Sequence, residues 1–168
     1  MRSASRLLVT LLCALWLGGC GIYSFSGAAL PEEIETVAIP LAEDRSVGLP
    51  GLDQQLTDQL VQRFVDRTRL RLEPDEGAAD AVLVTVIERY TNEPAAVTGD
   101  ETAALTRISI SVQARLDEEG RDEPRVDRAF TASDTFDPSE GIAGEAALAE
   151  ELLRRIADDL FTAIASDW

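Results

Sequence analysis

The chain lacks several residue types on which enzymes rely. Its 168 residues include no histidine and no lysine, and the two cysteines are Cys13 and Cys20. Imidazole bases, imidazole metal ligands, lysine Schiff bases and the lysine of a P-loop are therefore excluded. The sequence also has no G-x-S-x-G motif and no calcium-loop order of acidic residues. We expect a protein that is not an enzyme and that holds neither a metal nor a dissociable cofactor.

Positive charge is also scarce. The 15 basic residues, all arginines, stand against 31 Asp and Glu residues, which gives a formal net charge of −16 at pH 7. Such a surface repels the phosphate backbone of nucleic acids, so we expect no nucleic-acid partner. An acid excess with arginine as the sole base resembles proteins of salt-loving bacteria. A GC-rich genome, which favours arginine codons, explains the same usage equally well.

One apolar run, Leu7–Leu17, follows a short positive segment that contains Arg2 and Arg6. The run is too short to span a bilayer as a helix, which takes about 20 residues, but it suits the apolar centre of a secretory signal peptide. Leu17-Gly18-Gly19-Cys20 comes next and resembles the lipobox of bacterial lipoproteins. We predict that residues 1–19 are a signal peptide cleaved before Cys20. An ordinary secretion signal that happens to end in cysteine is the alternative.

A lipobox implies that Cys20 carries diacylglycerol on its thiol and a fatty acyl chain, such as palmitate, on its freed amine. Two or more acyl chains anchor a protein stably, whereas one chain is marginal. Gly21, in the position where Asp holds some lipoproteins at the inner membrane, is compatible with transfer to the cell outer membrane. We expect residues 20–35 to be the lipidated N-terminus and a linker, and residues 36–168 to form a single domain.

Two amphipathic helices are predicted. Apolar residues recur at three- and four-residue steps from Leu52 to Val65, with polar residues between them. The same spacing continues from Ala149 to Ala165, and Ser139 or Glu140 could start that helix. Neither apolar stripe continues as coiled-coil heptads, so we expect both helices to pack on a sheet.

Four segments have the composition or the alternation of β-strands, namely 36–41, 81–87, 105–116 and 125–136. The alternation in 105–116 is typical of an antiparallel strand with one wet face. Extra short strands are predicted at 23–25 and 70–72, and loops at 43–51, 89–101 and 117–124. The order β-α-β-β-β-α predicts an α+β two-layer sandwich, with the two helices on one face of a mixed, mostly antiparallel sheet.

Three arginines are candidates for contact with a lipid phosphate, because the guanidinium fork matches phosphate geometry. Arg107 and Arg115 project from the wet face of the predicted strand 105–116, and we expect Arg89 to lie near them. Cross-strand ion pairs with the surplus carboxylates are the alternative role for these side chains.

Several segments together resemble one known family. The lipobox is followed by G-I-Y-S-F-S-G, V-A-I-P, L-T-D-Q-L-V-Q-R-F, L-R-L, A-D-A-V-L-V-T-V-I-E-R-Y and R-I-S-I-S-V-Q-A-R-L. In this order they resemble the LptE family of lipopolysaccharide-assembly outer-membrane lipoproteins. The resemblance implies a domain seated one-to-one in the lumen of a large outer-membrane β-barrel. Such a domain helps the barrel to assemble and to hand lipopolysaccharide to the outer leaflet, without covalent chemistry.

Family members contact lipopolysaccharide through basic residues, and here that role would fall to Arg107, Arg115 or Arg89. The strong acidity of the chain opposes an anionic ligand. A second interpretation is an envelope lipoprotein that regulates a cell-wall synthase or a transporter as an accessory subunit. A third, a lipid-anchored hydrolase, is disfavoured because nucleophile–base sets are missing.

Overall fold

The computed structural model describes residues 34–95 and 105–166. Along the chain, the elements are β1 (Thr36–Ala38), β2 (Glu43–Asp44), α2 (Leu52–Arg67), β3 (Arg71–Leu72), β4 (Ala81–Ala95), β5 (Leu105–Glu118), β6 (Val126–Phe136), the 3-10 turn η2 (Pro138–Glu140) and α3 (Gly141–Ser166).

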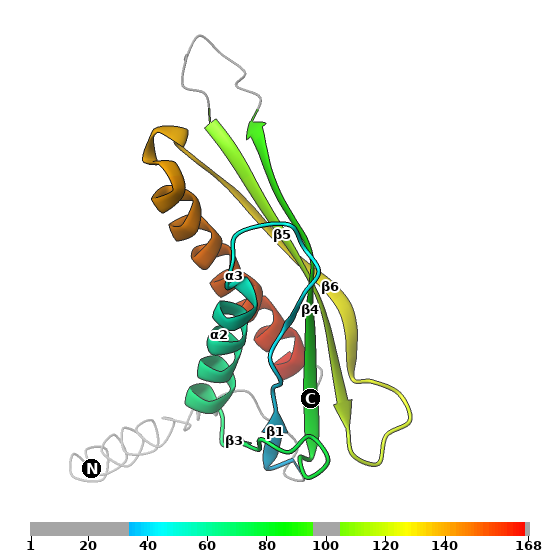
Figure 1. Ribbon diagram of the computed structural model, residues 1–168. Coiled ribbons are helices and arrows are strands. Elements are labelled where there is room, and N and C mark those ends of the chain that lie inside the picture. The colour runs from blue at the N-terminus through cyan, green and yellow to red at the C-terminus, as the bar shows by residue number, and fades with distance from the viewer. Residues whose placement is uncertain (1–33, 96–104, 167–168) are drawn as a thin grey trace, which may run out of the picture.

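These elements form two layers, with α2 and α3 on one face of the sheet (Figure 1). The strands lie in the order β3-β1-β4-β5-β6, and the short β2 pairs with β4 off this path. The pairings of β1 with β3 and β4, and of β2 with β4, are parallel. The long strands β4, β5 and β6 are antiparallel. The predicted α+β sandwich of two helices on a mixed, mostly antiparallel sheet is confirmed.

The core lies between the helices and one face of the sheet. In β5, the residues that were predicted to face inward, Ile108, Ile110, Val112, Ala114 and Leu116, are all buried. Their partners from the helices are the predicted apolar stripes, which include Leu56, Leu60 and Phe64 of α2 and Leu153, Ile156 and Leu160 of α3. The Phe64 and Phe161 rings meet edge to face at 5.4 Å between centroids, which joins the two helices.

The predicted loop at 89–101 is wrong over its first seven residues, because β4 continues to Ala95 and pairs with β5 as far as Leu105. The register shifts between Ile87 and Arg89, which is a β-bulge. A bulge inserts one residue and reverses the alternation of faces. The apolar pattern of 81–87 therefore breaks at the bulge although the strand itself does not.

Other boundaries also differ from expectation, and the strand expected at 36–41 ends at Ala38. The segment 43–51 was predicted as a loop throughout, but Glu43 and Asp44 pair with Val86 and Ile87 of β4. The turn predicted at 117–124 begins later, since β5 runs to Glu118. The expected strand 70–72 is present as β3, whereas the expected strand at 23–25 lies outside the described residues.

Candidate functional site

The sheet face that is turned away from the helices carries the three candidate arginines. The register pairs Arg89 with Ser111, Arg107 with Glu93, and Arg115 with Val84. These positions alternate with the buried residues of the same strands, so their side chains stand on the face that neither helix covers. We call this surface the open face.

Arg115 is held by two carboxylates. Its guanidinium donates to Asp117 at 2.9 Å and reaches Asp127 of β6 at 3.4 Å. The hydrogen bond to Asp117, together with the charge of that carboxylate, raises the pKa of Arg115 above its ordinary value. This is the arrangement expected of a cross-strand ion pair, so Arg115 is the least available of the three for an external phosphate.

Arg89 and Arg107 differ from Arg115. Among the described residues, no carboxylate lies within ion-pair distance of either guanidinium. Ser111, the neighbour of Arg89, is four residues from Arg107 and four from Arg115 along β5. Four residues of strand span about 13 Å, so the three arginines form a spread row and not a single cluster.

Hydroxyl groups fill the open face between the arginines. Ser109 and Ser111 of β5 pair with Ser133 and Thr131 of β6, and Thr131 donates to Ser111 at 3.1 Å. At the other end of the face, Val84 is 38% exposed beside half-buried Val82 and Val86. The open face is thus polar in its middle and partly apolar near β1.

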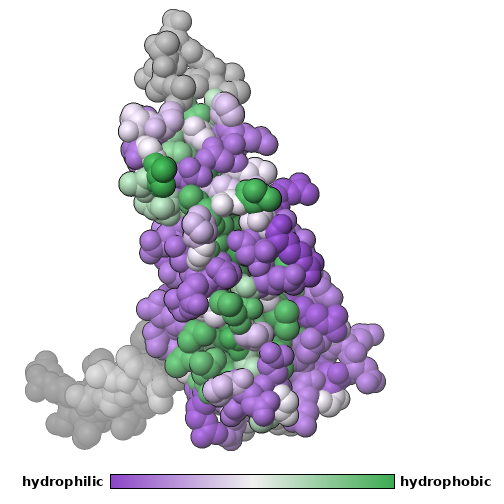
Figure 2. All heavy atoms as spheres, in the orientation of Figure 1, coloured by the Kyte–Doolittle hydropathy of each residue, from purple (hydrophilic) through white to green (hydrophobic). Residues whose placement is uncertain are grey.

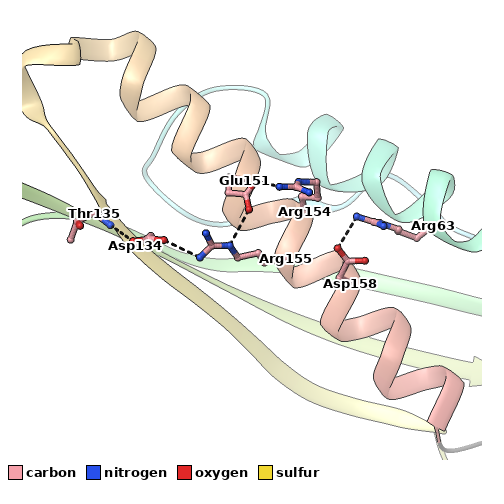
Figure 3. Close-up of polar contacts among 7 residues, drawn as sticks. All are labelled: Arg63, Asp134, Thr135, Glu151, Arg154, Arg155 and Asp158. Carbon is pink, nitrogen blue, oxygen red and sulfur yellow. Dashed lines mark hydrogen bonds and ion pairs between the residues drawn. The ribbon is translucent and has the colours of Figure 1, made fainter.

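The face of the molecule drawn in Figure 2 is mostly hydrophilic, with a hydrophobic area in the lower part of the view. Elsewhere in the described part of the chain, two hollows are lined largely by charged side chains. One, of about 550 Å³, lies beside the β5–β6 turn, where Arg125 pairs with the buried carboxylate of Glu118. The other, of about 390 Å³, lies along α2, where Arg63 donates to Asp158 of α3 at 2.7 Å (Figure 3).

No group of three or more potential metal ligands occurs within residues 34–95 and 105–166. In the same described ranges, no helix is long and apolar enough to cross a bilayer. Cys20, the predicted lipid attachment point, lies outside the described residues.

Sequence reasoning missed a carboxylate that ties β1 to β4. Oδ2 of Asp80 accepts hydrogen bonds from the Glu35 amide at 2.9 Å, the Thr36 amide at 2.8 Å and the Thr36 hydroxyl at 2.7 Å. The Thr36 hydroxyl in turn accepts from the Asp80 amide at 2.9 Å. These bonds, led by the Thr36 side chain, lower the pKa of Asp80. The signal was the A-D-A-V-L-V segment, whose acid directly precedes a central strand.

A second missed contact joins α3 to β4. The Tyr90 hydroxyl donates to Glu145 at 2.6 Å, and the Asn92 amide donates to the same oxygen at 2.8 Å. Burial and the Glu145 carboxylate raise the pKa of Tyr90. The Tyr90 ring also packs against Gly48, where a Cβ would lie 2.6 Å from the ring. No local pattern could reveal this contact, since Tyr90 was placed in a predicted loop.

The fold of the chain, two helices on one face of a mixed sheet, recurs in several solved structures. Among solved structures, a lipoprotein from Caulobacter crescentus is 16% identical with a TM-score of 0.52, covering 77% of this chain and 88% of its own. Lipoprotein B from Nitrosomonas europaea is 14% identical with a TM-score of 0.56, covering 84% and 87%. A protein from Xanthomonas campestris is 16% identical with a TM-score of 0.57, covering 79% and 85%. These likenesses show a shared fold.

The particular family follows from the sequence. The model of the family LptE, described as "Lipopolysaccharide-assembly", matches residues 34–164, and the chain belongs to that family. No curated protein matches the chain. Membership in this family indicates a protein of lipopolysaccharide assembly.

Proposed function

We propose that this chain is an outer-membrane lipoprotein that plugs a lipopolysaccharide-translocating β-barrel one-to-one and assists its assembly. The observation that carries the proposal is the LptE match over residues 34–164, which spans the sheet and nearly all of both helices. The acylated Cys20 would hold the domain on the periplasmic side of the outer membrane. The protein would perform no covalent chemistry.

The polar surface supports this role. Large outer-membrane barrels have polar, water-filled interiors, and a plug needs hydrogen-bonding groups on the faces that meet such a wall. The open face supplies hydroxyls from Ser109, Ser111 and Thr131, and α3 shows solvent a row of charges that includes Arg154 and Asp159. Such surfaces can exchange water for lumenal polar groups at little cost.

Direct contact with lipopolysaccharide would fall to Arg107 and Arg89 before Arg115. The first two have no carboxylate within ion-pair distance among the described residues, whereas Arg115 is held by Asp117 and Asp127. If this holds, Arg107→Glu should weaken capture of purified lipopolysaccharide, and Arg115→Glu should change it less. Equal capture by all variants would remove the arginines from the proposal.

The barrel partnership is tested by purifying the lipidated chain from outer membranes in mild detergent. We expect a large β-barrel to co-purify at one to one, and to become scarce in cells that lack this chain. Recovery with a cell-wall synthase and no barrel would contradict the proposal.

Cys20→Ala should release the chain from membranes that lack the barrel, because the acyl chains have no attachment point. Retention there would contradict the anchor.

The alternative is an accessory subunit of a cell-wall synthase or transporter. What favours it is that the fold recurs, at 10–16% identity, in lipoproteins and in a homologue of a neuraminyllactose-binding hemagglutinin from Helicobacter pylori. The fold by itself therefore does not select one machine, and the purification above separates the two.

A further inference from the structure

The strand β6 forms one border of the sheet. It pairs with β5 from Leu116 to Thr106 without interruption, and no described element pairs with its other side. Figure 3 shows α3 lying over the sheet while the outer side of β6 remains free of any ribbon. Free edges of this length usually carry charges, prolines or bulges that prevent pairing with another chain. The middle of β6, Ala129–Ser133, has none of these.

The sequence of β6 is complementary to itself. Thr131 is the midpoint of Val126–Phe136. If two copies pair antiparallel around a two-fold axis at Thr131, all eleven residues overlap. This register sets Arg128 opposite Asp134 of the second copy, twice by symmetry, and Val126 opposite Phe136. No other two-fold register of this strand brings Arg128 and Asp134 face to face.

Both members of that pair can take a further partner. The Arg128 guanidinium lies 4.9 Å from the centroid of the Phe130 ring, and no carboxylate of the described residues lies within ion-pair distance of it. Asp134 accepts from the Thr135 amide through Oδ1 and from Arg155 through Oδ2, both at about 3 Å (Figure 3). Each carboxylate oxygen has a second lone pair, so Asp134 can accept a bond from a second copy.

We propose that β6 is a self-association edge, through which two copies of this chain join their sheets around Thr131. The opposite-charge pair Arg128–Asp134 and the apolar pairs Val126–Phe136 and Phe130–Ala132, each formed twice, then stabilise the joined sheet. The long-range charge opposes association, since the full sequence carries a net −16 and residues 20–168, without Arg2 and Arg6, carry −18. The dimer should therefore form at about 0.15 M salt, where the screening length is about 8 Å, and weaken at low salt.

The proposal does not rest on the plug function. A one-to-one complex with a barrel contains a single copy of this chain, so its β6 edge is not paired with a second copy. The dimer would therefore be a form of the lipoprotein that has not yet joined a barrel. Failure of the dimer leaves the plug proposal standing, and failure of barrel co-purification leaves the dimer standing.

The first test uses single thiols. In residues 20–168 carrying Cys20→Ser, Thr131→Cys supplies the one thiol, and in the proposed register it faces its own copy at about 5 Å between Cβ atoms. Mild oxidation should link most chains into dimers. Ala129→Cys and Ser133→Cys should remain monomeric alone, because each thiol lies about 13 Å from its own copy, and should cross-link when mixed. Monomeric Thr131→Cys, or equal linkage at all three positions, would overturn the proposal.

The second test is charge reversal in residues 20–168, with Cys20 kept and no cysteine introduced. Arg128→Glu places like charges opposite Asp134 twice, and we expect the dimer dissociation constant from sedimentation to rise about tenfold or more. Arg89→Glu makes the same change in net charge away from the β6 edge. It should raise the dimer dissociation constant less than threefold, because only the screened net charge of the chain changes. Equal weakening by both variants would show a net-charge effect and overturn the register.

Discussion

The two ends of α3 are packed in opposite ways. From Ala149 to Ile164 the helix buries eight residues against α2 and the sheet, namely Ala149, Leu152, Leu153, Ile156, Ala157, Leu160, Ala163 and Ile164. From Gly141 to Leu148 it buries only Gly144, and Ile142 is 78% exposed. We refer to these parts of the molecule as the two-helix end and the single-helix end.

The difference follows from the length of α2, which ends after 16 residues while α3 runs for 26. A single helix covers a narrow stripe of a three-stranded sheet, so at the single-helix end polar contacts replace apolar ones. Tyr90 and Asn92 of β4 both reach Glu145 in the first part of α3. Regions with few buried apolar contacts open locally at lower free energy than the core. Global stability therefore resides at the two-helix end.

The largest expected effect is that of a charge in the two-helix end. Ile156→Asp buries an unpaired carboxylate at a fully buried position, and should cost several kcal/mol and unfold the domain. The matched change on the same helix, Ile142→Asp, should alter the free energy of unfolding by under about 0.5 kcal/mol. Urea denaturation followed by circular dichroism measures both. Similar losses for the two variants would abolish the comparison.

Gly48→Ala should act on the single-helix end. Its Cβ would lie 2.6 Å from Cγ of Tyr90, so the loop or the ring must move. We expect a loss of about 1–3 kcal/mol, with amide exchange accelerated first in residues 88–95 and 141–148. Gly77→Ala is the control, since its Cβ would meet only the Asp75 side chain at 3.4 Å. Uniform acceleration across the whole domain would contradict local opening.

Tyr90→Phe removes one hydrogen bond and keeps the ring. Because the Tyr90 hydroxyl donates to Glu145 at 2.6 Å, we expect the single-helix end to lose about 1 kcal/mol. Hydrogen exchange at the start of α3 should report this change, while exchange at Leu56 and Leu60 should not. Unaltered exchange at Glu145 and its neighbours would show that the bond contributes nothing.

Asp80→Asn should give the smallest change at neutral pH, since the amide oxygen still accepts a hydrogen bond. The folded pKa of Asp80 is lowered from 3.8, so its ionised form stabilises the fold at higher pH. That contribution is lost as pH falls through 3.8 and below. The melting temperatures of the parent chain and of Asp80→Asn should therefore converge as the pH falls from about 5 to about 2, the range in which a paired Asp takes up its proton. A constant gap over that range would contradict this role.

The segments predicted most closely are those in which one face is buried without interruption. The helix predicted from Leu52 begins at Leu52, and β5 follows the alternation of 105–116. The prediction failed for Arg89–Ala95, because the bulge after Ile87 reverses the alternation and the pairing with β5 cannot be seen locally. For the candidate site, the sequence placed Arg107 and Arg115 on the wet face. Arg115 is held first by Asp117, two residues along the same face of β5, which is a local pairing; its weaker second contact, with Asp127, depends on the neighbouring strand.

The amino-acid sequence by itself determined the lipobox pattern, both helical stripes, the alternation of β5 and the α+β class, since each is a local periodicity or a contiguous motif. Tertiary structure alone decided the length of β4, the Asp80 contact with Thr36, the Tyr90 contact with Glu145 and the free edge of β6. The physical reason is that these features depend on hydrogen bonds and packing between residues tens of positions apart, or on the sheet order, and no local pattern encodes which segments become neighbours.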